Sequence, residues 1–214
     1  MQGNLSLPNP NQLIIPILID LYSWIKKGLQ KISKTGMYEV LDYEITLEIL
    51  DSKGKRAFIK KTEEVRFLQD NIIAFQDQAW GAGKILLDYR CSPGIPVDFY
   101  TLGHKTQILI SLREVKNLGD IIKFNIQWKI INGFLKPIGF WATDVNHSTK
   151  SIKVNIIFPK ERPPKKMMTI EANSQRTANL DKDSLIQLPD NKWQITWVKK
   201  NPKVNEHYHI KWVW

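Results

Sequence analysis

The sequence predicts a mainly β protein, an antiparallel β-sandwich of about ten short strands with one N-terminal amphipathic helix. Apolar residues recur at intervals of three and four over residues 14–34, which is the period of a helix. From Tyr38 onward they recur at every second position, which is the period of a strand. Turn sequences separate these alternating runs at regular intervals, as they do in sandwiches and barrels.

The predicted helix follows a polar arm, residues 1–12, that contains two prolines. Pro16 suits the first helical turn, where the missing N–H would have no partner inside the helix. Lysines near the end of the helix suit its dipole, and Gly36 suits a C-terminal stop. The apolar stripe consists of Ile14, Ile17, Leu18, Leu21, Trp24, Ile25, Leu29 and Ile32.

The first half of the remaining chain predicts a series of hairpins. The strands expected there are residues 43–49, 56–67, 72–75, 84–89, 106–112 and 122–130. Asp51–Gly54 and Asn117–Asp120 are turn sequences between strands. Asn132-Gly133 is a strong hairpin signal at the end of the longest alternating strand, so we expect residues 140–145 to pair onward from it.

The second half continues the pattern to the last residue. The strands expected there are residues 152–158, 167–172, 185–188, 193–198 and 208–214, with a polar loop at 174–183. We therefore predict a polar arm plus helix at residues 1–36 and a single β-sandwich domain at 37–214. The prolines at 159–164 mark an edge, a crossover or an alternative sub-boundary. The part that follows these prolines is too short to bury its tryptophan-bearing strand faces alone, which favours a single domain.

Composition narrows the class of protein. Hydrophobic residues make up 43% and charged residues 24% of the 214 residues, as in ordinary globular proteins. Cys91 is the single cysteine, which excludes an internal disulfide and favours a reducing compartment. The longest apolar run, Leu13–Ile19, is much shorter than the ~20 residues of a transmembrane helix. We expect a cytoplasmic protein that is peripheral to a membrane at most, with no transmembrane span.

The net charge of +10 lies mainly at the two ends of the chain. The densest cations form a predicted basic surface of Lys160, Arg162, Lys165, Lys166, Lys199 and Lys200. With Trp193 and Trp197 nearby, these cations resemble the surfaces that bind single-stranded nucleic acid. The two tryptophans share a strand face with Ile195, however, and a place in the core explains them more simply. Nucleic acid is therefore an alternative partner that the sequence does not favour.

Three short motifs could carry chemistry, and each has a simpler structural interpretation. Gly81-Ala-Gly83-Lys84 lacks the spacing and the following helix of a phosphate loop. Cys91 and His104 would make a hydrolase or transferase if the histidine activated the thiol. We expect instead that Cys91 is a half-buried structural residue in a long irregular loop. His207 and His209 share a strand face and would need a third metal ligand, for which Asp144 and His147 are the candidates.

We therefore predict a non-enzymatic recognition module with no catalytic residues, cofactor or metal. Its helix would dock to a partner protein or to an anionic membrane surface through residues 14–34. The alternative that the helix packs on its own β domain stays open. The residues expected to bind the partner or membrane are Ile17, Leu21, Trp24, Ile25, Lys26, Lys27 and Lys31.

Overall fold

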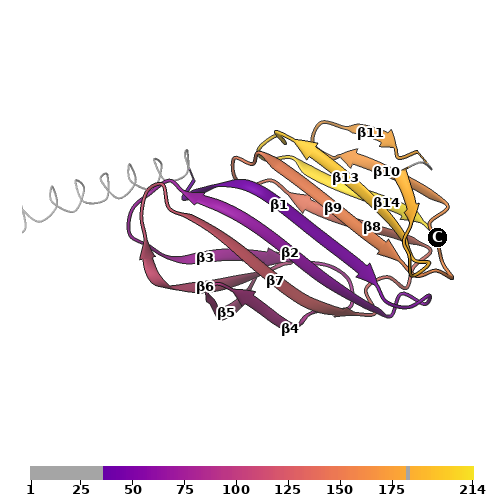
Figure 1. Ribbon diagram of the computed structural model, residues 1–214, viewed down its shortest axis with the longest axis horizontal. Coiled ribbons are helices and arrows are strands. Elements are labelled where there is room, and N and C mark those ends of the chain that lie inside the picture. The colour runs from indigo at the N-terminus through magenta and orange to yellow at the C-terminus, as the bar shows by residue number, and fades with distance from the viewer. Residues whose placement is uncertain (1–35, 182–183) are drawn as a thin grey trace, which may run out of the picture. The chain divides into compact units, whose positions relative to one another are not determined.

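The computed structural model describes residues 36–181 and 184–214, which form a mainly β protein of 14 strands in three sheets (Figure 1). The chain divides into two units, Met1–Met37 and Tyr38–Trp214, and every strand belongs to the second. The predicted helix and its partner-binding residues lie outside the described residues. Within the described residues there is no helix long and apolar enough to cross a membrane.

The large sheet has the strand order β12-β13-β9-β1-β2-β7-β4. Its strands are β1 (Tyr38–Ile49), β2 (Arg56–Phe67), β4 (Lys84–Ser92), β7 (Ile121–Ile131), β9 (Ser151–Phe158), β12 (Leu185–Gln187) and β13 (Trp193–Lys200). Neighbouring strands are antiparallel except β1 and β9, which are parallel. The prediction of an antiparallel arrangement therefore fails for this one pair, because alternation shows which face a residue occupies but not the direction of the neighbouring strand.

Two smaller sheets complete the unit. The β14 sheet has the order β11-β10-β14-β8, and the β6 sheet has the order β3-β6-β5. Their strands are β3 (Ile72–Ala79), β5 (Ile95–Leu102), β6 (Lys105–Lys116), β8 (Ile138–Asp144), β10 (Lys166–Glu171), β11 (Arg176–Asn179) and β14 (His207–Val213). In Figure 1 these two sheets lie at opposite ends of the β unit.

Both small sheets pack on the same face of the large sheet. Residues directly opposite each other on neighbouring strands share a face. Lys61 of β2 lies opposite Ile45 of β1 and Ile126 of β7, and Ile45 lies opposite Val154 of β9. One continuous, largely apolar face therefore runs across the large sheet.

Aromatic contacts fix each small sheet to that face. Phe124 of β7 stacks on Phe75 of β3, with ring centroids 4.2 Å apart. Phe158 of β9 meets Trp212 of β14 edge to face at 5.4 Å. All four side chains are at most 1% exposed. The core thus has two parts, one under the β6 sheet and one under the β14 sheet.

Most of the predicted strands are confirmed, and three local predictions were wrong. The strand β5 occupies part of the predicted irregular loop, and β11 occupies part of the predicted loop at 174–183. The strand β8 does not form a hairpin with β7 but pairs with β14. The segment after β7 instead bonds to the β1–β2 turn, because Asn132 N–H donates to Lys55 O and Phe134 N–H donates to Gly54 O. These bonds lead the chain away from β7.

The proline-rich segment at 159–164 connects β9 of the large sheet to β10 of the β14 sheet. It carries the chain from one layer to the other, and Arg162 within it lies over the Trp214 ring at 4.0 Å.

We expect Trp128→Ala to lower the free energy of unfolding by about 3–5 kcal/mol, because a large buried aromatic side chain leaves a cavity when it is deleted. Trp128 is 3% exposed and stacks on Tyr89 at 6.2 Å. The matched control is Ile121→Ala on the same strand, where the side chain is 51% exposed and little should change. Equal effects in chemical denaturation would contradict the register of β7.

Candidate functional site

A pocket of about 450 Å³ lies on the core face of the large sheet, where the two small sheets part. Its floor comes from β1, β2 and β7 of the large sheet. One wall follows the end of β3 and the Trp80–Ala82 segment, and the opposite wall is β8 with the segment before it. Six aromatic residues line it: Tyr43, Trp80, Trp128, Phe134, Phe140 and Trp141.

A buried group of charges reaches the floor of the pocket through Lys61. The Lys61 ammonium is paired with Glu63 on its own strand at 3.0 Å and with Asp77 of β3. Lys61, Glu63 and Asp77 are all at most 7% exposed. The Tyr89 hydroxyl donates to the second oxygen of Asp77 at 2.8 Å. Lys61 itself also lines the pocket.

Burial and mutual attraction shape the protonation of this group. Burial alone would lower the pKa of Lys61, but the carboxylates of Asp77 and Glu63 raise that pKa well above its ordinary value. Burial raises the pKa of Glu63, the Lys61 ammonium opposes that rise, and Asp77 adds to it. A charge this deeply buried is tolerated because it is paired. The ion pair between Lys61 and Asp77 also joins β2 to β3 across the two layers.

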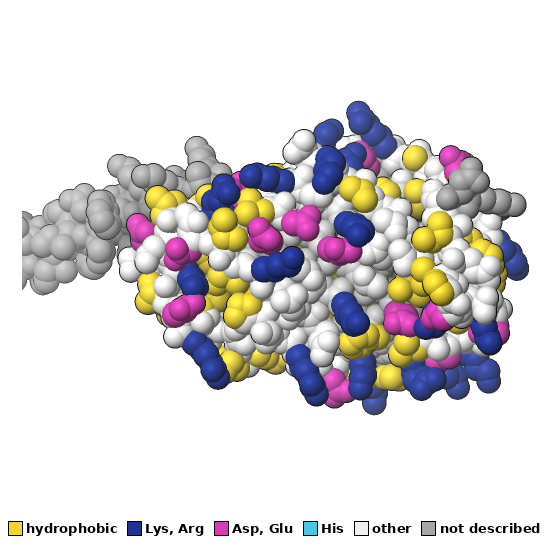
Figure 2. All heavy atoms as spheres, viewed as in Figure 1, with side chains coloured by type: hydrophobic (Ala, Val, Ile, Leu, Met, Phe, Trp, Pro, Cys, Tyr) yellow, Lys and Arg dark blue, Asp and Glu magenta, His cyan; other side chains and the backbone are white. Residues whose placement is uncertain are grey.

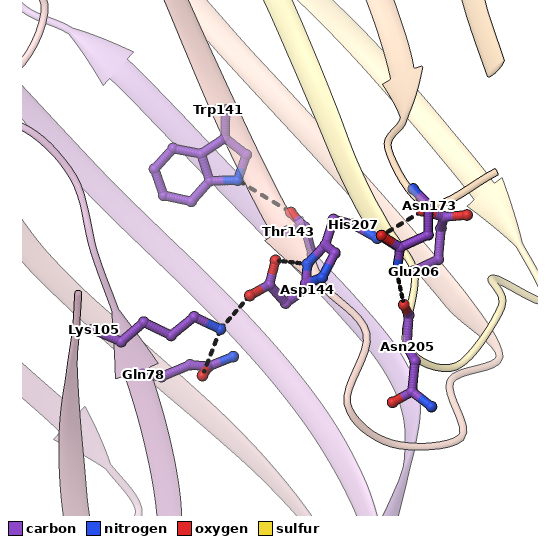
Figure 3. A network of polar contacts seen from close by, with 9 residues as sticks. All are labelled: Gln78, Lys105, Trp141, Thr143, Asp144, Asn173, Asn205, Glu206 and His207. Atoms are coloured by element: carbon purple, nitrogen blue, oxygen red, sulfur yellow. Dashed lines mark hydrogen bonds and ion pairs between the residues drawn. The ribbon is translucent and has the colours of Figure 1, made fainter. Parts of the chain in front are cut away.

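A second polar network connects the two small sheets beside the pocket (Figure 3). Lys105 of β6 pairs with Asp144 of β8, and its ammonium lies over the Trp80 ring at 4.6 Å. Asp144 also contacts His207 Nδ1 of β14 at 2.6 Å. Burial would raise the pKa of Asp144, but hydrogen bonds from Lys105 and His207 lower it below its ordinary value.

The turn before β14 is held by Glu206, a buried carboxylate that is 2% exposed. It accepts hydrogen bonds from the backbone N–H of Asn173 at 2.7 Å and of Ser174 at 3.0 Å, and also from the Ser174 hydroxyl. The N–H of His207 completes the set at 2.9 Å. Burial alone would raise the pKa of Glu206, but these hydrogen bonds lower it to about 2. Glu206 thus fixes the β10–β11 turn against the start of β14.

No hydrogen bond joins Cys91 and His104, the alternative nucleophile and base, in the part of the chain that the structure describes. Cys91 lies in strand β4 and not in a loop, and its thiol lies 3.4 Å from the Pro93 carbonyl oxygen. His104 lies 13 positions further along the chain, after the eight-residue strand β5, which itself spans about 26 Å. Burial and the Asp77 charge raise the pKa of Cys91 to about 12, the opposite of what an activated thiolate requires. His104 does line the pocket.

The predicted histidine pair shares a strand face but does not form a metal site. His207 contacts Asp144, whereas His209 stacks on Phe140 with centroids 6.1 Å apart. The candidate third ligand His147 lies against Tyr38 at 4.2 Å. No group of three or more His, Cys, Asp or Glu residues with the geometry to hold a metal ion occurs in the part of the chain that the structure describes.

The residues of the predicted basic surface are divided among separate contacts. Lys199 pairs with Glu171 and lies 5.5 Å from the Tyr208 ring, and Lys200 donates to the Ser151 hydroxyl at 3.1 Å. Arg162 donates to the Ser52 carbonyl at 3.0 Å, while Lys165 and Lys166 are exposed. On the face seen in Figure 2, Lys and Arg side chains are spread out, with Asp and Glu side chains among them.

Neither the pocket nor the buried charges beside it were predicted from the sequence. A signal for them was present in strand β2, whose core-facing positions alternate in the order Ala57, Ile59, Lys61, Glu63 and Val65. Two charged residues in succession at inward positions indicate a buried ion pair. The pocket itself has no such signal, because it depends on how the separate sheets are placed.

Comparison with known proteins shows a likeness of fold alone. The sequence matches no protein-family model and no curated protein. An M1 zinc metallopeptidase mutant of Deinococcus radiodurans, bound to a Tyr-Ser-Ala substrate, matches 82% of this chain with a TM-score of 0.51 and 8% identity. A two-domain M1 zinc metallopeptidase mutant bound to L-tryptophan matches 82% with a TM-score of 0.51 and 7% identity. The matched region spans 42% and 43% of those chains, which is less than half.

We expect the stabilisation that Glu206 provides to depend on pH. Its pKa is about 2 when folded, against an ordinary value of 4.5. Because the folded pKa is the lower of the two, the stabilisation is complete above pH 4.5 and is lost as the pH falls through about 2. The free energy of unfolding of Glu206→Gln should therefore be lower than that of the wild type at neutral pH. This difference should narrow below pH 4.5.

Urea denaturation at a series of pH values measures this difference. Glu161→Gln serves as the control, because Glu161 is exposed and lies 3.7 Å from Lys160. A gap between wild type and Glu206→Gln that stays constant down to pH 2 would show that the Glu206 carboxylate is not the source of the stabilisation.

Proposed function

We propose that the β unit is a non-enzymatic recognition module that takes an apolar group of its ligand into the pocket between the three sheets. The observation that carries this proposal is the aromatic lining of an open pocket in which Lys61 is already paired with two buried carboxylates, while Lys105 and Asp144 beside the pocket are paired with each other. Aromatic walls with a few polar groups are typical of ligand-binding sites.

The state of the charged groups favours binding over catalysis. Lys61, Asp77 and Glu63 neutralise one another in part, and Lys105 and Asp144 neutralise each other beside the pocket. A general base or nucleophile must instead be available to the substrate. The high pKa of Cys91 and its distance along the chain from His104 support the same interpretation.

We expect the apolar dye anilinonaphthalene sulfonate to bind in the pocket and to become fluorescent there. Ala82→Trp should weaken this binding at least ~10-fold, because Ala82 lines the pocket and an indole ring would fill it. The matched control is Ala178→Trp on the exposed strand β11, which should leave dye binding unchanged. Equal dye affinity in all three proteins, measured by fluorescence titration, would contradict a ligand site in this pocket.

The N-terminal segment completes the proposal. We propose that residues 14–34 form the amphipathic helix and attach the module to a partner protein or an anionic membrane surface in a reducing compartment such as the cytoplasm. An apolar stripe of eight large residues is stabilised only when something covers it. The change of period coincides with the start of β1 at Tyr38, which supports a helix that can be separated from a complete β-sandwich.

Removal of residues 1–36 should leave a folded β unit and abolish this attachment. An interfacial helix should sediment with phosphatidylserine-containing vesicles, and Lys26→Glu with Lys27→Glu should release it. A docking helix should ignore vesicles and lose its partner on Leu21→Asp or Ile25→Asp. Circular dichroism of the truncated chain provides the control. If the truncated chain unfolds, the helix belongs to the core and the attachment proposal is wrong.

A further inference from the structure

We propose that the free edge of β8 binds an extended peptide by strand addition, with an aromatic side chain of that peptide in the adjacent pocket. This inference rests on the proposed function, since it names the ligand class of the same pocket. Strand addition uses backbone hydrogen bonds for affinity and side-chain pockets for specificity.

The hydrogen-bond register shows which backbone groups of β8 point outward. Val145 N–H donates to Glu206 O, and Trp214 N–H donates to Pro137 O, so the odd-numbered residues of β8 pair with β14. In an antiparallel ladder the intervening residues direct N–H and C=O to the other side. Among residues 36–181 and 184–214, β8 pairs with β14 alone, which leaves the outward groups of Ile138, Phe140 and Ala142 unpaired.

The pocket lies directly along this edge. Five consecutive residues, 138–142, line it. Side chains of consecutive strand residues point to opposite faces of a sheet. A single cavity can therefore contact all five only if it runs beside the strand. A peptide paired with β8 would lie along the pocket, opposite the Trp80–Ala82 segment.

The edge of β8 differs from the other sheet edges of the described chain. β3, β4 and β5 each contain a register shift, and β12 and β11 have only three and four residues. Such irregular or short edges discourage pairing with another strand. β8 is regular over seven residues and exposes Ile138 by 49% and Phe140 by 56%. Apolar side chains on a regular free edge are what an added strand would cover.

Lysines around the pocket favour acidic residues on either side of the aromatic residue of the peptide. Lys136 lines the pocket, Lys211 lies opposite Phe140, and Lys84 follows the Trp80–Ala82 wall. None of these three lysines forms an ion pair with another described residue. Lys61 can also donate to the ligand. Its ammonium carries three N–H groups, and its two ion-pair partners leave one of these for a ligand carbonyl. The ligand is therefore an acidic peptide with a central aromatic residue.

The first test uses the full-length chain and a display library of seven-residue peptides randomised at every position. We expect the selected peptides to share an aromatic residue flanked by acidic ones. The best peptide is then synthesised and N-methylated at one position at a time. Since alternate N–H groups of an added strand face β8, methylation at alternate positions should weaken binding about tenfold or more, and methylation between them should not.

The second test changes the protein. Ala142→Pro removes one outward N–H of β8 and leaves the bonds to β14 in place. It should weaken binding of the peptide about tenfold or more. The control is Thr177→Pro, which removes an outward N–H from the edge strand β11 and should leave peptide binding unchanged. If the Ala142→Pro variant does not fold, binding of the N-methylated peptides to the wild-type chain decides whether strand addition occurs.

Three outcomes would overturn the inference. A library without enrichment, or an N-methyl series without alternation, excludes strand addition. If Ala82→Trp still weakens dye binding, the proposed ligand site in the pocket stands without strand addition. A purified dimer that becomes monomeric on Ala142→Pro would show that a second copy of this chain occupies the edge, which excludes a peptide as the ligand.

Discussion

The arrangement of the sheets depends on the buried ion pair between Lys61 of β2 and Asp77 of β3. Each charge alone would be strongly unfavourable in the core, so the two strands are stable only in a placement that brings the groups together. Removing one partner of such a buried pair typically costs about 3–5 kcal/mol, because the other charge is left without compensation. The pair therefore fixes the position of the β6 sheet on the large sheet, while the aromatic stack of Phe75 on Phe124 supplies the apolar contact.

This pair also explains why one charged side chain, Lys61, lies in the otherwise apolar floor of the pocket. Apolar side chains at positions 61 and 63 would let the layers close by hydrophobic contact alone. Lys61 and Glu63 instead place charge between the large sheet and the β6 sheet, and charge is accommodated only where each group finds a partner. The Lys61 side chain both ties the layers together and reaches the pocket.

The sequence was sufficient to predict what depends on local pattern. The first hairpin, the alternation of β7 and the buried final strand are all confirmed, because period and turn chemistry are encoded in adjacent residues. The partner of β8 and the parallel pairing of β9 were beyond prediction from pattern, since they depend on which distant strand supplies the matching edge. His104 was singled out for chemistry and instead lines the pocket, whereas Trp80 and Trp141 were not singled out at all.

The seam between the two small sheets follows from the width of the large sheet. Seven strands present a face that the narrower β6 and β14 sheets cover side by side. Trp212 fills the space directly under β8, where a Cβ at Gly139 would lie 2.4 Å from its ring. Beyond β8 the pocket remains open, and the contact from Lys105 to Asp144 joins the two small sheets beside it. A site whose walls are held in this way needs little ordering when a ligand binds, so more of the contact energy is available for affinity.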